Sequence, residues 1–514
     1  GKISYNASHN NTAVAVQGSN PLFTMNGGEI CYNYGAGNNY GTIMATNGTE
    51  DGVLRVNLLG GSIHHNRGSI GTAIVTYGNA ETMITGDCEI YENSSNTTNN
   101  ANVVYVNNEG GKLIIDGNAA IHDNTMTNIV AATLGGSIEF KGNAAIYNNT
   151  TETQNGCASI SVGGNSTLYM SENALIYGNV AKGGATAGIY ISGENAKAYL
   201  EGGTITENKT YKTNDDNTYP GSGVRLPANN TSAELHLNGD IEVYGNIAAI
   251  VTDYTSLTPV KYVGEDYGDY VGKDKVFPAD VSIEFAYRTG EGGKCYIDGA
   301  LTTENYIGIS PGNVLLSQEK EPLTMIHGAD SYIITENDFS KLVFNGFYYN
   351  RNHAMYLDSQ DNKIIRTNNT NSSQAKAISI TLNANYGSPA EMLGQKVAPG
   401  YQAFLIPTPF VRDGHTFVGW NTVAGGTGTI YNDRAAVTTT DALTLYAQWQ
   451  AAETVSLTAD DTSVTYGTPV TLAATPAIEG WTYTWYKDGQ EVAGETDSSL
   501  VLTDVSDSGS YTVS

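Results

Sequence analysis

The sequence repeats one short phrase about every 30 residues, and this repetition limits the possible folds more than any other feature. "GNAAIHDN" at 117–124 returns as "GNAAIYNN" at 142–149. Eight such octets align on a closing asparagine, and the seven steps from Asn33 to Asn246 average about 30 residues. The eight residues are Asn33, Asn66, Asn93, Asn124, Asn149, Asn179, Asn208 and Asn246. A repeat of this length with uneven spacing is typical of a solenoid.

Each repeat carries short segments in which apolar residues alternate with polar ones. Three residues before each asparagine stands a larger apolar residue, at Ile30, Ile63, Ile90, Ile121, Ile146, Ile176, Ile205 or Val243. Alternating pairs such as Leu113/Ile115 and Val104/Val106 precede it. A period of two indicates strands, and no amphipathic helical run competes with it. We predict an all-β chain in which residues 1–375 form a parallel β-helix solenoid, with one coil per repeat.

The closing asparagines allow two interpretations. Asparagine tolerates a left-handed corner, and its amide can bond to the same residue in the neighbouring coil. The alternative is a ligand site built from asparagines. We favour a buried asparagine ladder inside the corner.

The residue after each buried isoleucine is expected to point outward, because side chains alternate along a strand. Tyr or His fills six of the eight positions in this column, which are Cys31, His64, Tyr91, His122, Tyr147, Tyr177, Thr206 and Tyr244. These aromatic residues could stack along the ladder and shield the backbone. They could also form a surface on which sugar rings stack. The two interpretations are compatible, and the six aromatic residues are our candidate binding site.

Composition excludes several partners. The chain has 25 Lys and Arg against 52 Asp and Glu, a net charge of −27, which disfavours nucleic acid and anionic membrane surfaces. No apolar segment is long enough for membrane insertion. The four cysteines, Cys31, Cys88, Cys157 and Cys295, show neither CxxC spacing nor a histidine at metal-ligand spacing. We therefore expect packed thiols, no metal site and no cofactor.

Catalysis is not expected. Enzymes that hydrolyse polysaccharides use two carboxylates about 5–10 Å apart. Among the residues that precede the asparagines, Glu92 and Asp123 are the only acidic pair in neighbouring repeats. The acidic, Tyr-rich segment 262–275 is interpreted as a solvated insertion, with cation or partner binding as the alternative.

Beyond Asn246 the repeat becomes irregular. We predict that residues 247–375 form further coils and a cap over the exposed edge of the sheet. The polar stretch "NNTNSSQ" at 368–374 is a natural linker.

Residues 376–450 contain Pro407-Thr408-Pro409, "GHTFVGW" at 414–420 and "LTLYAQW" at 443–449. This pattern resembles the internalin B-type repeat, also called the Listeria–Bacteroides repeat. The resemblance implies a small β-grasp-like module of extracellular bacterial proteins, without catalytic residues. Residues 451–514 resemble a bacterial Ig-like β-sandwich, with Trp485 at the core position and "DSGSY" at 507–511. Leu472 and Val513 stand near the usual cysteine positions, and the last strand is expected to be missing.

Together the three parts resemble bacterial adhesin-like surface proteins. The resemblance implies a monomeric, non-enzymatic protein, secreted or on the cell surface, that binds a glycan or a host or bacterial surface protein along an exposed β-helix face. A polysaccharide lyase or hydrolase is one alternative, and it requires two carboxylates in a groove on adjacent coils. A passive stalk is another, and it predicts that exposed aromatic residues are scattered.

Overall fold

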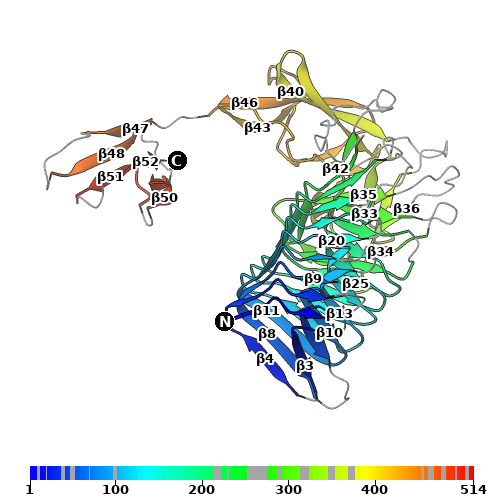
Figure 1. The fold of residues 1–514 in the computed structure, drawn as a ribbon. Helices are drawn as coiled ribbons and strands as arrows, with labels where there is room; N and C mark the ends of the chain where they lie inside the picture. Colours follow the sequence, from blue (N-terminus) through cyan, green and yellow to red (C-terminus); the bar gives the residue numbers. More distant parts are fainter. Residues whose placement is uncertain are drawn as a thin grey trace. The chain divides into compact units, whose positions relative to one another are not determined.

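The computed structural model describes residues 1–8, 12–18, 20–35, 41–46, 52–68, 70–95, 101–153, 156–213, 221–228, 231–251, 275–285, 291–312, 323–344, 353–367, 377–452, 456–460, 468–475, 482–492, 495–503 and 509–513. Strands make up nearly all regular structure in these ranges, as Figure 1 shows, and the one helix is α1 (Glu336–Ser340). The predicted all-β class is confirmed. This helix is too short to cross a membrane. The acidic segment 262–274 and the linker 368–374 lie outside the described residues.

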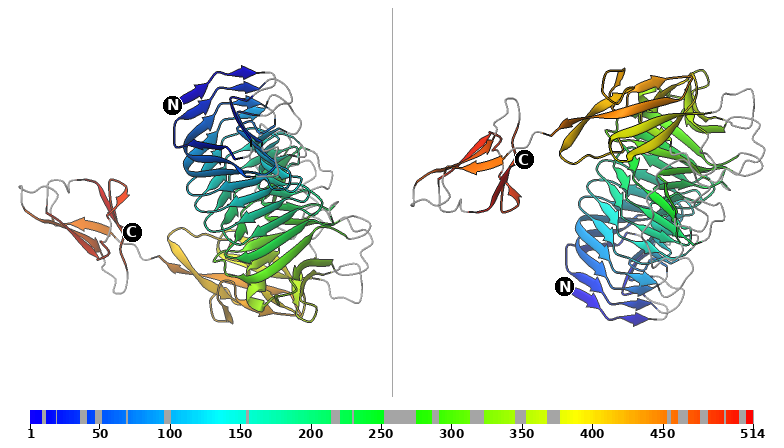
Figure 2. Two further views of the ribbon diagram at one scale, coloured as in Figure 1. Left: turned by 90° about the horizontal axis from the view of Figure 1, so that it is seen from below. Right: turned by 90° about the horizontal axis from the view of Figure 1, so that it is seen from above.

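Two units divide the chain. The first comprises Gly1–Pro409 and Trp420–Ala447, and the second comprises Phe410–Gly419 and Gln448–Ser514. A sheet of 30 strands dominates the first unit. Its strands come from successive repeats and most pair in parallel, so that equivalent residues of neighbouring repeats lie side by side (Figures 1 and 2).

Three files of strands form this sheet, and each file takes one strand from each repeat. The first holds the isoleucine column: β1 (Lys2–Ser4), β5 (Glu29–Cys31), β8 (Leu54–His64), β11 (Ala80–Tyr91), β15 (Ala120–His122), β18 (Ala145–Tyr147), β22 (Leu175–Tyr177), β26 (Thr204–Thr206) and β30 (Glu242–Tyr244). The second contains β4 (Leu22–Met25), the leading halves of β8 and β11, β14 (Lys112–Ile115), β17 (Ser137–Phe140), β21 (Thr167–Met170), β25 (Lys197–Leu200), β29 (Glu234–Gly239), β34 (Lys294–Leu301) and β36 (Leu323–Gly328). The third contains β3 (Val14–Gln17), β7 (Ile43–Thr46), β10 (Ile74–Tyr77), β13 (Asn102–Asn107), β16 (Asn128–Thr133), β20 (Cys157–Val162), β24 (Ile189–Ile191), β28 (Val224–Leu226), β33 (Val281–Glu284) and β35 (Ile307–Gly312).

Short strands after the asparagines form two smaller sheets. One joins β2 (Ala7–Ser8), β6 (Tyr34–Gly35), β9 (Arg67–Gly68) and β12 (Ser94–Ser95). The other joins β19 (Thr150–Thr151), β23 (Val180–Lys182), β27 (Lys209–Lys212), β31 (Ile247–Ile250) and β32 (Lys275–Pro278).

The apolar residues of all three files meet in one continuous core. The isoleucine column is buried in every repeat, and so are pairs such as Leu113/Ile115 and Val104/Val106. The apolar residues of the alternating segments are therefore the buried ones, as predicted from the sequence. All four cysteines are buried and none forms a disulfide.

The closing asparagines form the predicted ladder. Each side-chain Nδ2 donates to the Oδ1 of the next asparagine at 2.8–3.0 Å, and each Oδ1 also accepts from a backbone N–H. The side chains are buried, with at most 5% exposure. Asn6 donates into the first member, and Asp280 accepts from the last. The ladder is thus two residues longer than the sequence repeat indicates.

The residue before each asparagine turns the corner. Its φ is positive throughout, at Tyr32, His65, Glu92, Asp123, Asn148, Gly178, Glu207 and Gly245. A left-handed conformation in a residue other than glycine is unfavourable by about 1 kcal/mol or more. The asparagine ladder must therefore hold these corners in place.

The parallel pairing stops near β36, which pairs antiparallel with β39 (Lys363–Arg366). β39 in turn pairs antiparallel with β38 (Met355–Asp358), while β37 (Leu342–Phe344) extends the third file beside β35. Thr335 caps α1 in a reciprocal capping box with Asp338.

Residues 377–452 hold a sheet in the order β41 (Ala390–Val397), β40 (Ile378–Gly387), β46 (Leu443–Ala451), β43 (His415–Asn421), β44 (Ile430–Tyr431), and the pair β42 (Gln402–Phe404) and β45 (Ala436–Thr438). Two three-stranded antiparallel sheets follow. They are β47 (Ser456–Ala459), β48 (Val470–Thr475) and β51 (Ser499–Leu502), and β50 (Gln490–Glu491), β49 (Trp485–Lys487) and β52 (Tyr511–Val513). Trp485 is fully buried in a small core with Leu472 and Leu500.

Replacing Asn124 by Ala should reduce the free energy of unfolding by about 3 kcal/mol or more. The change removes the side-chain acceptor of the Asn93 backbone N–H and the buried amide that donates to the carbonyls of Ile90 and His122. Chemical denaturation measures the loss.

Asn118→Ala is the matched control, because Asn118 belongs to the same repeat but bonds at the surface to Asp87. It should change the unfolding free energy by no more than about 0.5 kcal/mol. Equal effects of the two substitutions would contradict the structural role of the buried ladder.

His353 should make stability depend on pH. Its Nδ1 bonds to the Thr367 carbonyl, and burial, together with Arg366, lowers its pKa from 6.5 to about 4. The stabilisation is complete above about pH 6.5 and is lost as the pH falls toward 4. In this range His353 is protonated in the unfolded chain but stays neutral in the folded protein. The total is about 3 kcal/mol.

His353→Asn keeps a donor near the Nδ1 position but does not titrate. As the pH falls from 6.5 toward 4, the denaturation midpoint of the wild type should fall more steeply than that of His353→Asn. Parallel curves would show that His353 is not protonated differently in the folded and unfolded states.

Candidate binding surface

The outward column forms a continuous stack of rings over four steps. Ring centroids lie 4.8 Å apart for His64–Tyr91, 5.2 Å for Tyr91–His122, 4.8 Å for His122–Tyr147 and 4.9 Å for Tyr147–Tyr177. The interplanar angles are 3–15°. We call these five residues the first ring ladder. The structure therefore brings together five of the six candidate residues.

Tyr244 stands apart from this ladder. Thr206 occupies the register position between Tyr177 and Tyr244. The Tyr244 ring instead lies 5.7 Å from the Tyr306 ring, at an angle of 50°.

Stacking changes what the first ring ladder can offer to a ligand. An inner ring has both faces against its neighbours, so it presents its edge and its polar tip to solvent. Tyr91, His122, Tyr147 and Tyr177 are half-buried, and His64 is only 8% exposed. Sugar rings need a free aromatic face, which an inner ring does not have. Burial accordingly raises the pKa of Tyr91, Tyr147 and Tyr177.

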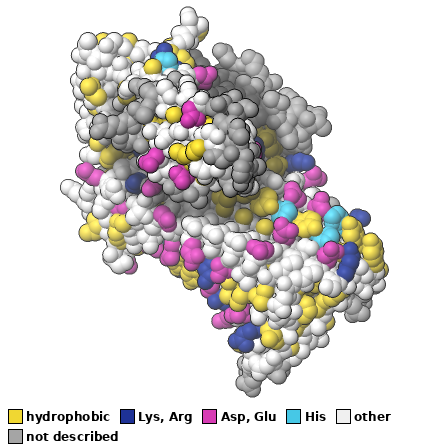
Figure 3. All heavy atoms as spheres, turned by 90° about the vertical axis from the view of Figure 1, so that its left-hand side faces the viewer, with side chains coloured by type: hydrophobic (Ala, Val, Ile, Leu, Met, Phe, Trp, Pro, Cys, Tyr) yellow, Lys and Arg dark blue, Asp and Glu magenta, His cyan; other side chains and the backbone are white. Residues whose placement is uncertain are grey.

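The acidic corner residues hold the histidines. His122 Nδ1 lies 2.7 Å from Asp123 Oδ2, and His65 Nε2 lies 3.0 Å from Glu92 Oε2. Glu92 and Asp123, the acidic pair of neighbouring repeats, are thus each engaged with an imidazole. On the face drawn in Figure 3, histidine side chains lie beside acidic side chains and beside those of the class that includes tyrosine.

A second ring ladder, which the sequence analysis missed, runs along the second file. Centroids lie 5.1 Å apart for Tyr169–Tyr199, 4.4 Å for Tyr199–His236 and 5.0 Å for His236–Tyr296, and His327 follows at 5.6 Å. Its members stand between the two apolar residues of each alternating pair, as in Leu168-Tyr169-Met170. Reading that middle position as a column would have found it.

Tyr169 begins the second ring ladder and is 46% exposed. Its register partner in the preceding repeat is Glu139, which carries no ring. Glu139 lies 2.6 Å from Lys112 and 3.7 Å from Lys141. Tyr169 therefore has no ring stacked on the face toward the preceding repeat, and the charged group around Glu139 lies on that side.

A mixed group of donors lies where the first ring ladder ends. Cys31 is the register partner of His64, and Glu29 stands two residues before Cys31 on the same strand. The ligand atoms of these three side chains all lie within 4.8 Å of one another. Burial, followed by the nearby His65, lowers the pKa of His64. The sequence analysis expected no metal site, because it searched only for ligands close together in the sequence.

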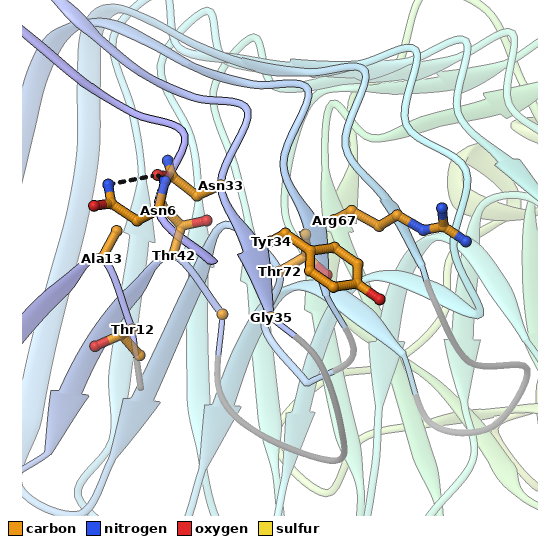
Figure 4. Close-up of a pocket in the computed structure, with 10 residues that line it drawn as sticks. Asn6, Thr12, Ala13, Asn33, Tyr34, Gly35, Thr42, Arg67 and Thr72 are labelled. Atoms are coloured by element: carbon orange, nitrogen blue, oxygen red, sulfur yellow. Dashed lines mark hydrogen bonds between the residues drawn. The ribbon is translucent and has the colours of Figure 1, made fainter. Parts of the chain in front are cut away.

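A small pocket near the start of the chain is too small for a sugar. Asn6, Asn33, Tyr34, Arg67 and Thr72 are among its lining residues (Figure 4), and its volume is about 30 Å³. That volume fits one water molecule. The buried Thr72 hydroxyl has no hydrogen-bond partner among the described residues, and an ordered water could bond to it there.

These features define an all-β protein with a large, mostly parallel sheet and two outward ring ladders. The family model of the Listeria-Bacteroides repeat domain matches residues 379–448, inside the predicted 376–450 module. No curated protein and no solved structure matches the chain. The match indicates a bacterial, surface-associated protein with repeats.

Tyr147→Ala should lower the free energy of unfolding by about 2–3 kcal/mol, because it removes two ring stacks and uncovers His122 and Tyr177. Tyr147→Phe keeps both stacks and should change it by less than about 1 kcal/mol. Denaturant titration distinguishes the two. A loss of similar size in both variants would mean that the hydroxyl, and not ring stacking, stabilises the ladder.

Proposed function

We propose that this chain is an extracellular, non-enzymatic, adhesin-like protein in which residues 1–375 form a parallel β-helix that binds a glycan on its outer face. The proposal assigns a β-grasp-like module to residues 376–450 and an Ig-like domain to residues 451–514. The match to the Listeria-Bacteroides repeat domain supports the surface location. The parallel register of the strand files supports the β-helix.

The observation that carries the glycan proposal is the exposed ring of Tyr169. Aromatic rings bind sugars through an open face, and polar groups at the side of the ring bond to the hydroxyls. Tyr169 is exposed and has no ring stacked on the face toward Glu139, and Lys112 and Lys141 lie close to that carboxylate. Tyr199 supports the ring from behind at 5.1 Å. Tyr169 is thus assigned as the ring that stacks on the sugar. The hydroxyl groups of Tyr147 and Tyr177 are assigned as further hydrogen-bonding groups for the glycan.

A passive stalk is the second candidate. The contiguous ladders do not match the scattered aromatic residues expected for a stalk, but ring stacking also has a purely structural explanation. The inner rings of both ladders shield the strands beneath them, which is sufficient reason for their presence. In a stalk, Tyr169 would be no more than the first ring of a structural column.

A glycan array probed with the full chain tests the proposal. Wild-type protein should bind a defined subset of glycans, and Tyr169→Ala should lose at least about tenfold in affinity. Tyr169→Phe, which retains the ring, should keep most of the binding. Tyr5→Ala is the matched control. Tyr5 is also an exposed tyrosine, but it follows β1 and stacks on Tyr32, so it belongs to neither ring ladder.

Unchanged binding in Tyr169→Ala would disprove the assignment to this ring. A blank array from folded wild-type protein would favour the stalk or a protein ligand.

A further inference from the structure

The end of the first ring ladder gathers three chemically different donors. Glu29 Oε2 lies 3.8 Å from Cys31 Sγ and 3.9 Å from His64 Nε2. Zinc binds sulfur at about 2.3 Å and nitrogen or oxygen at about 2.0–2.2 Å, which puts neighbouring tetrahedral ligands about 3.4–3.6 Å apart. The two distances to the carboxylate must shorten by only a few tenths of an ångström to reach this geometry. Cys31 Sγ and His64 Nε2 lie within 4.8 Å of each other, so this pair needs a shift of no more than about 1.2 Å.

The surroundings of His64 favour a free lone pair on Nε2. Its Nδ1 lies 2.8 Å from His65 Nδ1, so one of these atoms must donate and the other accept. His65 Nε2 lies 3.0 Å from the Glu92 carboxylate, which can only accept when ionised. His65 then donates from Nε2 and accepts at Nδ1, so His64 donates from Nδ1. This arrangement aims the lone pair of His64 Nε2 at Glu29.

Such a relay is a common support for metal sites. A histidine that binds a metal usually donates its other N–H to an acceptor, which fixes the orientation of the ring. Here His65 and Glu92 provide that support. The Tyr91 ring, stacked on His64 at 4.8 Å, holds the imidazole from the other side.

We propose that Glu29, Cys31 and His64 form a Zn²⁺ site with one coordination position open to solvent. A donor set of one sulfur, one nitrogen and one oxygen suits zinc, and three protein ligands leave the fourth position for water. On binding, the Cys31 thiol releases its proton to solvent. The ligands come from β5 and β8, so the metal would join two successive repeats.

A cation already stands beside this site. The ammonium of Lys2 lies 2.8 Å from Glu29 Oε2, and its interactions with Glu29 and Cys31 raise the pKa of Lys2. Lys2 is exposed and its side chain is flexible, so it can leave when a metal binds. The structure therefore predicts competition between Lys2 and the metal.

The other cysteines are poor substitutes for Cys31. Burial raises the pKa of Cys88 and of Cys157 to about 12, and it also raises the pKa of Cys295, which keeps all three as neutral thiols. A thiolate is the form that binds metal. Binding through sulfur should therefore depend on Cys31 alone.

Titration of the full, reduced and metal-free chain with Co²⁺ tests the site, because a cobalt–thiolate bond gives an absorption band that other ligands do not. The wild type should develop this band at one equivalent, and Zn²⁺ should abolish it. Cys31→Ser should remove the band. His65→Gln should keep the band and weaken binding by about 10–100-fold, since it breaks only the supporting relay. Lys2→Met should tighten binding a few-fold.

Far-UV circular dichroism and the melting temperature without metal show whether each variant is folded. Zn²⁺ should raise the melting temperature of the wild type and leave that of Cys31→Ser unchanged. A thiolate band that persists in Cys31→Ser would overturn the proposal. So would the absence of any band in the wild type, or a band seen only in Lys2→Met, because the ammonium would then exclude the metal from the native site.

Discussion

The buried asparagine ladder is the interaction on which the rest of the first unit depends. Each amide satisfies backbone groups of its own repeat and of the preceding one and donates to the asparagine side chain of the next, as Asn124 does with His122, Ile90 and Asn149. A shift of one residue between neighbouring repeats would leave several buried polar groups without partners, at about 1–3 kcal/mol each. Hydrophobic burial also opposes a shift of one residue, but it tolerates a shift of two, which keeps the same side chains on the core face. The ladder therefore fixes the register.

Because the register is fixed, residues at the same position of successive repeats lie next to one another along the sheet. The residue two positions before each asparagine always stands over its counterpart in the next repeat, at the 4.8 Å spacing of β-strands. That spacing is close to the distance at which parallel rings stack, and the centroids of His64, Tyr91, His122, Tyr147 and Tyr177 follow it. Tyr and His are interchangeable in this column because both are flat rings with a polar edge. The alternation between "IHDN" and "IYNN" therefore preserves the stack.

Much of this arrangement could be predicted from the sequence, because it repeats. The isoleucine column, the asparagine ladder and the first ring ladder each depend on one position per repeat, and alignment of the octets displays them. The second ring ladder was missed because the alternating pairs were used only as markers of the core, and Tyr169 or Tyr199 between them was not followed. The group of Glu29, Cys31 and His64 was missed because Cys31 and His64 lie in different repeats, so that strand register alone makes them neighbours.

The geometry of stacking also decides where such a surface can recognise anything. A ring inside a ladder has both faces covered, and its capacity to bind a flat or apolar group is already used by its neighbours. Only the ends of a ladder retain unused capacity. The second ring ladder begins at Tyr169, which has no ring on the side of Glu139. The first begins at His64, where Cys31 takes the place of the next ring, and finishes at Tyr177, where Thr206 does. The repeated positions thus build the scaffold, and the positions at which the repetition fails are where specific chemistry becomes possible.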